Sequence, residues 1–253
     1  MTQKIQLTLS IVSHQQAGLI AQLLADLKTC GVSALEIILT INTPETIPFK
    51  AESFEFPITI INNASPKGFG ANHNAAFELA RGEYFCVLNP DIRLARSPFP
   101  LLLAELEDQS VGATGPLICN PAGQVEKSAR RFPTLLSLAR KAVFGESDDK
   151  YGSEAPVVYP DWIGGMFMVF RTTTFRMIGG FDPSYFLYYE DVDICWRLSR
   201  KGLRVSRIST ATAIHDARRS SHRNLRYLRW HISSLARFLR LRLQEKLKQI
   251  SNF

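Results

Sequence analysis

Cysteine and long apolar runs are both scarce in this chain of 253 residues. The four cysteines, Cys30, Cys86, Cys119 and Cys195, lie far apart and form no Cys-x-x-Cys pair, which argues against a zinc site and against a disulfide framework. No apolar run is long enough to cross a bilayer, and residues 1–6 lack the apolar region of a secretion signal. These absences predict a cytoplasmic protein that is either soluble or peripheral on a membrane.

Acidic charge is scarce at one end of the chain. From Ala217 onward there are ten Lys and Arg residues and one acid, Glu245, a net charge of +9, whereas the remaining residues carry a net charge of −2. Leucine and isoleucine recur there at helical spacing, at Leu225, Leu228, Ile232, Leu235, Leu239 and Leu243. A basic amphipathic helix is typical of an anionic membrane surface, although a helix packed on the protein has the same pattern.

The first hundred residues alternate short apolar strands with helical patterns. Strands are expected at Ile5 to Val12, Glu36 to Ile41 and Ile58 to Ile61, and the first helix at Gly18 to Leu27. Such alternation predicts a parallel sheet of βαβ units. With 45% hydrophobic residues, the chain can bury one sizeable core.

A loop with two glycines lies before the next helix, which is expected from about Ala71 to Ala80. Gly68 and Gly70 would let the backbone approach a ligand closely, the helix N-terminus would offer N–H groups to phosphate oxygens, and Lys67 adds a positive charge. The loop has neither the dinucleotide fingerprint Gly-x-Gly-x-x-Gly nor a P-loop. A purely structural turn is the alternative.

A carboxylate follows directly on the strand expected at Tyr84 to Leu88. Its continuous apolar run is typical of a parallel strand covered on both faces. Pro90 ends the strand, so Asp91 should lie on the loop at its carboxyl end. Ligands of open α/β sheets bind at that edge, which makes Asp91 a candidate ligand residue rather than only a turn residue.

A second acidic group opens a later helix, at Glu190-Asp191-Val192-Asp193. Acids in a first helical turn complement the helix dipole, which accounts for Asp193. Asp191 follows an aromatic stretch and is expected at the lip of a cleft, partly desolvated, where it could act as a base. His215 follows a strand expected at the end of the domain. Asp91, Asp191 and His215 together indicate a divalent-metal and general-base site.

Four ordered blocks of the sequence resemble glycosyltransferase family 2, the inverting enzymes with the GT-A fold, and in particular their bacterial rhamnosyltransferase-like branch. The blocks are Gly68-Phe69-Gly70-Ala71-Asn72-His73-Asn74, Leu88-Asn89-Pro90-Asp91, Gly164-Gly165-Met166-Phe167-Met168, and Gly179-Gly180-Phe181-Asp182 through Phe186 to Asp193. The resemblance extends to about His215 and implies a mainly parallel α/β sheet in a catalytic domain of residues 1–216, with a donor half at about 1–95 and an acceptor half at 96–216. The charge and leucine pattern described above adds a basic helical tail at 217–253.

The resemblance also implies roles for individual residues. Asp191 would be the catalytic base, and Asp91 and His215 would hold Mg²⁺ or Mn²⁺. The donor, a dTDP- or UDP-sugar, would contact Ser13, His14, Asn42, Lys67, Gly68, Phe69, Asn74, Asn89 and Asp91. The acceptor, a saccharide or lipid-linked saccharide for cell-surface polysaccharide synthesis, would contact Trp162, Gly164, Gly165 and Glu190, with the tail on the cytoplasmic face of the anionic inner membrane.

Two departures from the family pattern leave the nucleotide base open. Asn42 follows Ile41, where members commonly have Asp-Asn, and the first strand ends in Ser13-His14 instead of Asn-Tyr-Asn. Two other functions are considered. A nucleotidyltransferase usually carries a signature rich in glycine and basic residues at the first strand, and this signature is missing here. A nucleic-acid-binding protein would use the basic tail, but the tail contains no recognised nucleic-acid-binding motif.

Overall fold

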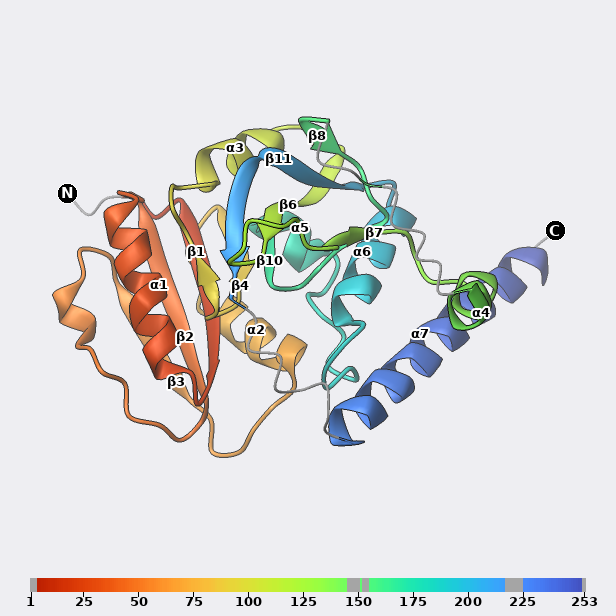
Figure 1. The fold of residues 1–253 in the computed structure, drawn as a ribbon, viewed down its shortest axis with the longest axis horizontal. Helices are drawn as coiled ribbons and strands as arrows, with labels where there is room; N and C mark the ends of the chain where they lie inside the picture. Colours follow the sequence, from red (N-terminus) through yellow and green to blue (C-terminus); the bar gives the residue numbers. More distant parts are fainter. Residues whose placement is uncertain (1–3, 145–150, 152–154, 217–224, 252–253) are drawn as a thin grey trace.

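The computed structural model describes residues 4–144, 151, 155–216 and 225–251 (Figure 1). Its main sheet has the strand order β3-β2-β1-β4-β10-β6-β11-β5, with β8 paired to β11, and β7 and β9 form a separate two-stranded sheet. The strands are β1 (Leu7–His14), β2 (Leu35–Thr43), β3 (Ile58–Asn62), β4 (Tyr84–Leu88), β5 (Ile92–Arg93), β6 (Val111–Cys119), β7 (Ala129–Arg130), β8 (Val157–Val158), β9 (Trp162–Ile163), β10 (Phe167–Arg171) and β11 (Arg204–His215).

Helices cover both faces of this sheet and extend beyond it (Figure 1). They are α1 (Ala17–Thr29), α2 (Phe69–Phe77), α3 (Phe99–Glu105), α4 (Leu135–Phe144), α5 (Thr172–Met177), α6 (Glu190–Arg200) and α7 (Leu225–Ser251), with a 3-10 turn η1 at Ala51–Ser53. The predicted first helix ends as expected, with Gly31 at φ +61°, a conformation that glycine adopts without strain.

Strand β4 is buried on both faces, as its apolar run predicts. Cys86 and Leu88 contribute to a core formed with α1 and the neighbouring strands. Phe85 and Val87 point the other way, into a core formed with α2, α5 and α6. The alternation follows from the two-residue period of a strand. It places the residues after Leu88 at the edge of a sheet that is covered on both sides.

The sheet is parallel in its first half and mixed beyond β4. Strands β1, β2, β3 and β4 all pair in parallel, so their carboxyl ends lie at one edge. Strand β10, from the second half of the sequence, is inserted between β4 and β6 and is antiparallel to both, while β6 and β11 are parallel. Strands from the first and the second half of residues 7–215 therefore share one sheet.

Three element boundaries do not follow from the local sequence pattern. The apolar stretch 162–170 is not one strand: β9 pairs with β7, and β10 belongs to the main sheet. The intervening turn arises because the Gly164 N–H donates to Ser128 O and Met166 O accepts from Asn89 N–H. Helix α2 begins at Phe69, not Ala71. Strand β11 runs without a break from Arg204 to His215, with an irregularity in pairing between Ile208 and Thr212.

Helix α7 packs against α6 and the segment that leads into it. Phe238 is fully buried beside Tyr189 and Trp196, and Ser234 Oγ donates to Leu187 O at 3.0 Å. The Arg237 guanidinium bonds Asp182 at 2.9 Å. In Figure 1 the helix runs beside α6, on the side of the protein away from α1. No helix in the described part of the chain is both long and apolar enough to cross a bilayer.

Candidate active site

The predicted donor residues gather at the carboxyl edge of β1, β2 and β4. Ser13 and His14 end β1, Asn42 lies at the end of β2 and Asn89 directly follows β4. His14 Nδ1 is 3.0 Å from Thr43 Oγ1, and Ser13 Oγ accepts from the Gln16 N–H at 3.2 Å. Because the strands are parallel, these residues lie at the edge where α/β proteins bind nucleotides.

Asn42 fixes the glycine-containing loop to this edge. Its Oδ1 accepts from the Lys67 N–H at 2.8 Å, and its Nδ2 donates to Lys67 O at 3.0 Å. Asn63, at the end of β3, donates to the same Oδ1 at 2.8 Å and to Asn72 Oδ1 at 2.7 Å. The side-chain amide of Asn42 thereby holds the backbone of the loop at Lys67, while the Lys67 side chain stays exposed.

The glycines of that loop serve packing rather than a ligand. A Cβ on Gly68 would lie 2.7 Å from Phe186 O, and one on Gly70 would lie 2.6 Å from the Phe181 side chain. The Phe69 N–H, at the helix start, already donates to Phe186 O at 2.8 Å. The structure therefore favours the structural alternative for these glycines over the phosphate cradle.

Asn74 also has a structural role. Its side chain accepts from the Phe181 N–H at 2.9 Å and donates to Phe181 O at 2.7 Å. Both amide ends thus bind α2 to the turn after Gly179-Gly180. The structure gives no support to a donor contact from Asn74.

Asp91 lies on the loop after β4, as predicted, and faces His215 at the end of β11. His215 Nε2 is 3.4 Å from Asp91 Oδ2. Asp91 Oδ1 is buried and accepts no hydrogen bond from the described residues. A buried carboxylate oxygen without a donor is costly unless a ligand satisfies it, which suits a bound cation.

Glu126, which the sequence analysis missed, completes this group. Its Oε2 is 3.0 Å from His215 Nδ1, so the imidazole lies between two carboxylates. A carboxylate on the second ring nitrogen fixes the orientation of a ligating histidine. Burial lowers the pKa of His215, but its hydrogen bonds to Asp91 and Glu126 and their charges outweigh burial and raise that pKa from 6.5 to about 9.

Asp91 and His215 fit a divalent cation whose remaining ligands come from the phosphates of a bound ligand. No group of three His, Cys, Asp or Glu side chains suited to a metal occurs in the part of the chain that the structure describes. Asp91 and His215 could supply two ligands. Mg²⁺ is commonly held by one or two carboxylates together with substrate phosphates rather than by a complete protein cage.

Asp191, in the first turn of α6, is held by backbone N–H groups. Its Oδ2 accepts from Gly165 at 3.0 Å and its Oδ1 from Val192 at 2.8 Å. Burial raises the pKa of Asp191, although these N–H groups and the charge of Arg130 oppose the rise. As a whole residue, Asp191 is half-buried. A raised pKa and a fixed orientation both suit a general base.

Asp91 and Asp191 are connected through one turn, at Gly164-Gly165-Met166. The Asn89 N–H, two residues before Asp91, donates to Met166 O at 2.9 Å, and the Gly165 N–H donates to Asp191. A Cβ on Gly165 would contact both Asp191 Cβ and the Phe69 ring at 3.4 Å. The turn therefore brings the end of β4 and the start of α6 together.

The backbone leading into α6 is strained. Tyr188 and Tyr189 have φ of +69° and +68°, and each such non-glycine residue costs roughly 1–3 kcal/mol. The ring of His231, on α7, lies 5.4 Å from Tyr188 and 5.3 Å from Tyr189. Helix α7 thus packs on the segment that positions Asp191.

The remaining acids of α6 differ in environment. Asp193 bonds Arg197 at 2.7 Å, which agrees with its predicted helical role. Glu190 is buried, and burial together with the charge of Asp191 raises its pKa well above the usual value. A neutral Glu190 would present a carboxylic acid, not a second base.

Trp162 borders this region but is anchored to the protein. Its Nε1 donates to Arg131 O at 2.9 Å, and the Arg130 guanidinium lies 5.5 Å from the ring centre. Arg130 also acts electrostatically on Asp191 and Tyr189. No motif singles out Arg130, which lies in the two-residue strand β7 and reaches Asp191 only through the tertiary fold.

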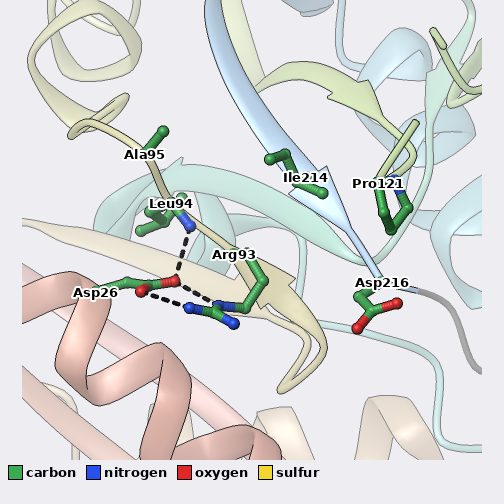
Figure 2. Close-up of a pocket in the computed structure, with 7 residues that line it drawn as sticks. All are labelled: Asp26, Arg93, Leu94, Ala95, Pro121, Ile214 and Asp216. Atoms are coloured by element: carbon green, nitrogen blue, oxygen red, sulfur yellow. Dashed lines mark hydrogen bonds and ion pairs between the residues drawn. The ribbon is translucent and has the colours of Figure 1, made fainter. Parts of the chain in front are cut away.

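A separate hollow lies behind β5 (Figure 2). Asp26 there bonds the Arg93 guanidinium at 2.6 and 2.9 Å and accepts from the Leu94 N–H at 3.0 Å. The hollow borders the Asp91 site at Asp216, the residue after His215. Since both Asp26 oxygens are paired, we assign no catalytic role to it.

The sheet order agrees with the GT-A fold, and a family model identifies the class of enzyme. Residues 8–174 match the model of Glycosyl transferase family 2, and residues 151–223 match that of the N-terminal domain of galactosyltransferase. The chain therefore belongs to glycosyltransferase family 2. This membership decides for glycosyl transfer over the nucleotidyltransferase and nucleic-acid-binding alternatives.

The curated relatives include rhamnosyltransferases. Rhamnosyltransferase WbbL of Escherichia coli K12 is 31% identical over 68% of this chain and 70% of its own length. N-acetylglucosaminyl-diphospho-decaprenol L-rhamnosyltransferase of Mycobacterium tuberculosis is 32% identical over 56% of this chain and 50% of its own length. This chain thus spans only about half of the mycobacterial relative.

Solved structures share the fold at low identity. GalNAc-T7, solved with UDP, GalNAc and Mn²⁺, has a TM-score of 0.65 and 14% identity over 86% of this chain and 45% of its own. The mannosyltransferase PcManGT of Pyrobaculum calidifontis, with GDP-Man and Mn²⁺, has a TM-score of 0.63 and 17% identity over 87% of this chain and 60% of its own.

The carboxylates beside His215 lead to a prediction about stability. The pKa of His215 is near 6.5 in the unfolded chain and about 9 in the metal-free folded protein. Protonated His215 therefore stabilises the fold in full below pH 6.5, and this stabilisation is lost as the pH rises through 9. We expect the unfolding temperature in EDTA to fall over this range, and to fall less in Glu126→Gln. His14→Gln is the control and should retain the wild-type fall. Equal slopes in wild type and Glu126→Gln would contradict the pairing.

Proposed function

We propose that this chain is an inverting, metal-assisted glycosyltransferase that transfers a sugar, with rhamnose the best candidate, from a dTDP- or UDP-linked donor to a lipid-linked saccharide. The observation that supports the proposal is the turn at Gly164-Gly165-Met166. Its Met166 O accepts from the N–H of Asn89, two residues before Asp91, and its Gly165 N–H donates to Asp191. One site would thereby offer ligands for a cation and a base for an alcohol.

Asp91 and His215 would hold Mg²⁺ or Mn²⁺, which when bound neutralises the charge that develops on the departing nucleoside diphosphate. Both named structural neighbours contain Mn²⁺ with a nucleotide or nucleotide-sugar, which supports this assignment. The end of β2 and the Lys67 loop, joined by Asn42, would hold the nucleotide in the first half of the domain.

Asp191 would remove the proton of the acceptor hydroxyl as the hydroxyl oxygen attacks the anomeric carbon of the donor sugar. The bond to the diphosphate breaks on the opposite face, so the configuration inverts in a single displacement. Trp162, Glu190 and the Gly164-Gly165 backbone would border the acceptor in the second half. The acceptor class is suggested by the mycobacterial relative, whose name includes a diphospho-decaprenol.

A panel of nucleotide-sugars tests the donor class. With Mn²⁺ present, a dTDP- or UDP-sugar should raise the unfolding temperature, and GDP-mannose should raise it less. Transfer to a polyprenyl-diphospho-saccharide should release nucleoside diphosphate. Release of pyrophosphate from a sugar phosphate and a nucleoside triphosphate, with no transfer, would contradict the proposal.

A further inference from the structure

Helix α7 has a second apolar face that the domain does not cover. Its packed face carries Ser234 and Phe238, both buried. Five large apolar residues elsewhere on the helix are 55–83% exposed: Leu225, Leu228, Ile232, Leu243 and Leu247. Their spacings are multiples or near-multiples of a helical turn, so they form one stripe. We call these five residues the exposed stripe.

The sequence did not show which leucines would be buried. The packed face is set by the aromatic rings of Tyr189 and Trp196, which surround Phe238, and by Leu187 O, which accepts from Ser234. A helix that only covered the domain would present its leucines to it. Apolar residues left exposed on one side of the helix, toward both of its ends, instead mark an interaction surface.

The charges near the exposed stripe are positive. The Arg226, Arg229 and Arg240 side chains are exposed. The helix contains one acid, Glu245, which bonds Arg200 of α6 at 3.1 Å. Its negative charge is thus directed at the domain.

Helix α4 adds apolar surface close to α7. Leu135 and Leu136 are exposed at its start. Arg242, on α7, donates to Pro133 O at 2.9 Å, and its guanidinium lies 5.6 Å from the centre of the Phe132 ring. Figure 1 shows α4 beside the C-terminal half of α7.

We propose that the exposed stripe of α7 inserts into the surface of an anionic bilayer, with α7 lying parallel to it and its arginines at the lipid phosphates. An apolar stripe flanked by arginines is the pattern of interfacial helices. A second copy of this chain fits less well, because pairing two stripes would bring arginines together without acids to oppose them.

This inference rests on the proposed function, because a lipid-linked acceptor is the reason for the enzyme to bind a membrane. Helix α7 contacts Tyr188 and Tyr189, which lead into Asp191. A protein docked through α7 therefore holds the acceptor half of its site close to the lipid headgroups, where a diphospho-lipid acceptor lies.

Vesicle co-sedimentation of the full chain tests the proposal without donor or acceptor, so its outcome is independent of catalysis. Wild type should bind phosphatidylglycerol vesicles about tenfold more tightly than phosphatidylcholine vesicles, and added salt should weaken that binding. The variant Leu228→Ser/Ile232→Ser/Leu243→Ser should lose binding about tenfold or more. The variant Arg226→Glu/Arg229→Glu/Arg240→Glu should lose the preference for anionic lipid.

The matched control is Leu79→Ser/Leu101→Ser/Met177→Ser, which alters three exposed apolar residues away from α7 and should bind as wild type does. Unfolding temperatures identify variants that fail to fold; for these, single substitutions at Ile232 and Leu243 replace the triple variant. Wild-type binding by the folded stripe variants would overturn the proposal. A wild-type dimer that the stripe variants abolish, without vesicle binding, would assign the surface to a second copy.

Discussion

Replacing Asp191 by Asn is expected to lower turnover by a factor on the order of 10² to 10⁴, the usual contribution of a positioned general base. The Asp191 oxygens accept separately from Gly165 and Val192, and the single carbonyl oxygen of asparagine can keep only one of these contacts. The unfolding temperature of the variant therefore has to be measured beside its turnover. Donor affinity should change little, because the carboxylate acts on the acceptor. Transfer rates and calorimetric donor binding measure the two effects separately.

Asp193→Asn is the matched control for this variant. Asp193 lies two residues further along α6 and bonds Arg197. Its replacement should lower the unfolding temperature and leave the turnover number of the folded enzyme nearly unchanged. The pH profile gives a second check: burial raises the pKa of Asp191, and the wild-type rate should fall with decreasing pH at a value above that of an ordinary aspartate. Full transfer by Asp191→Asn would remove the residue from this role.

The position of Asp91 was predictable because its signals are local. The apolar run Tyr84 to Leu88, ended by Pro90, predicts a strand buried on both faces with a carboxylate at its end, and the structure has this arrangement. The start of α6 was predictable for the same reason, since acids in the first turn and bases in the last are helix signals. Both depend on residues within about ten positions of each other.

The parts that the sequence missed depend on contacts between distant segments. Glu126 and His215 are 89 residues apart and meet because β6 and β11 pair in parallel. Gly68 and Gly70 appear as ligand-binding glycines until the chain near Phe181 and Phe186 packs against them. Likewise, the Trp162 to Phe170 run has no internal sign that Met166 O is bonded to Asn89. Tertiary hydrogen bonding, not local preference, decides these cases.

Replacing Asp91 by Asn is expected to abolish the metal-dependent part of donor binding, a loss of at least about a hundredfold in affinity with Mn²⁺ present. The neutral amide removes the charge that faces the cation and also the partner of His215 Nε2. The residual affinity should equal that of wild type in EDTA. Calorimetry of donor binding with and without Mn²⁺ measures this difference without any transfer reaction.

Asp216→Asn is the control, because Asp216 also lies at this end of β11 but borders the hollow of Figure 2. It should retain the metal effect. The Asp91 variant also differs from Asp191→Asn in a diagnostic way: it should lose metal-coupled donor binding, whereas Asp191→Asn should keep it. If Mn²⁺ strengthened donor binding equally in wild type and Asp91→Asn, the cation would have to lie elsewhere, and the orphaned Asp91 Oδ1 would need another partner.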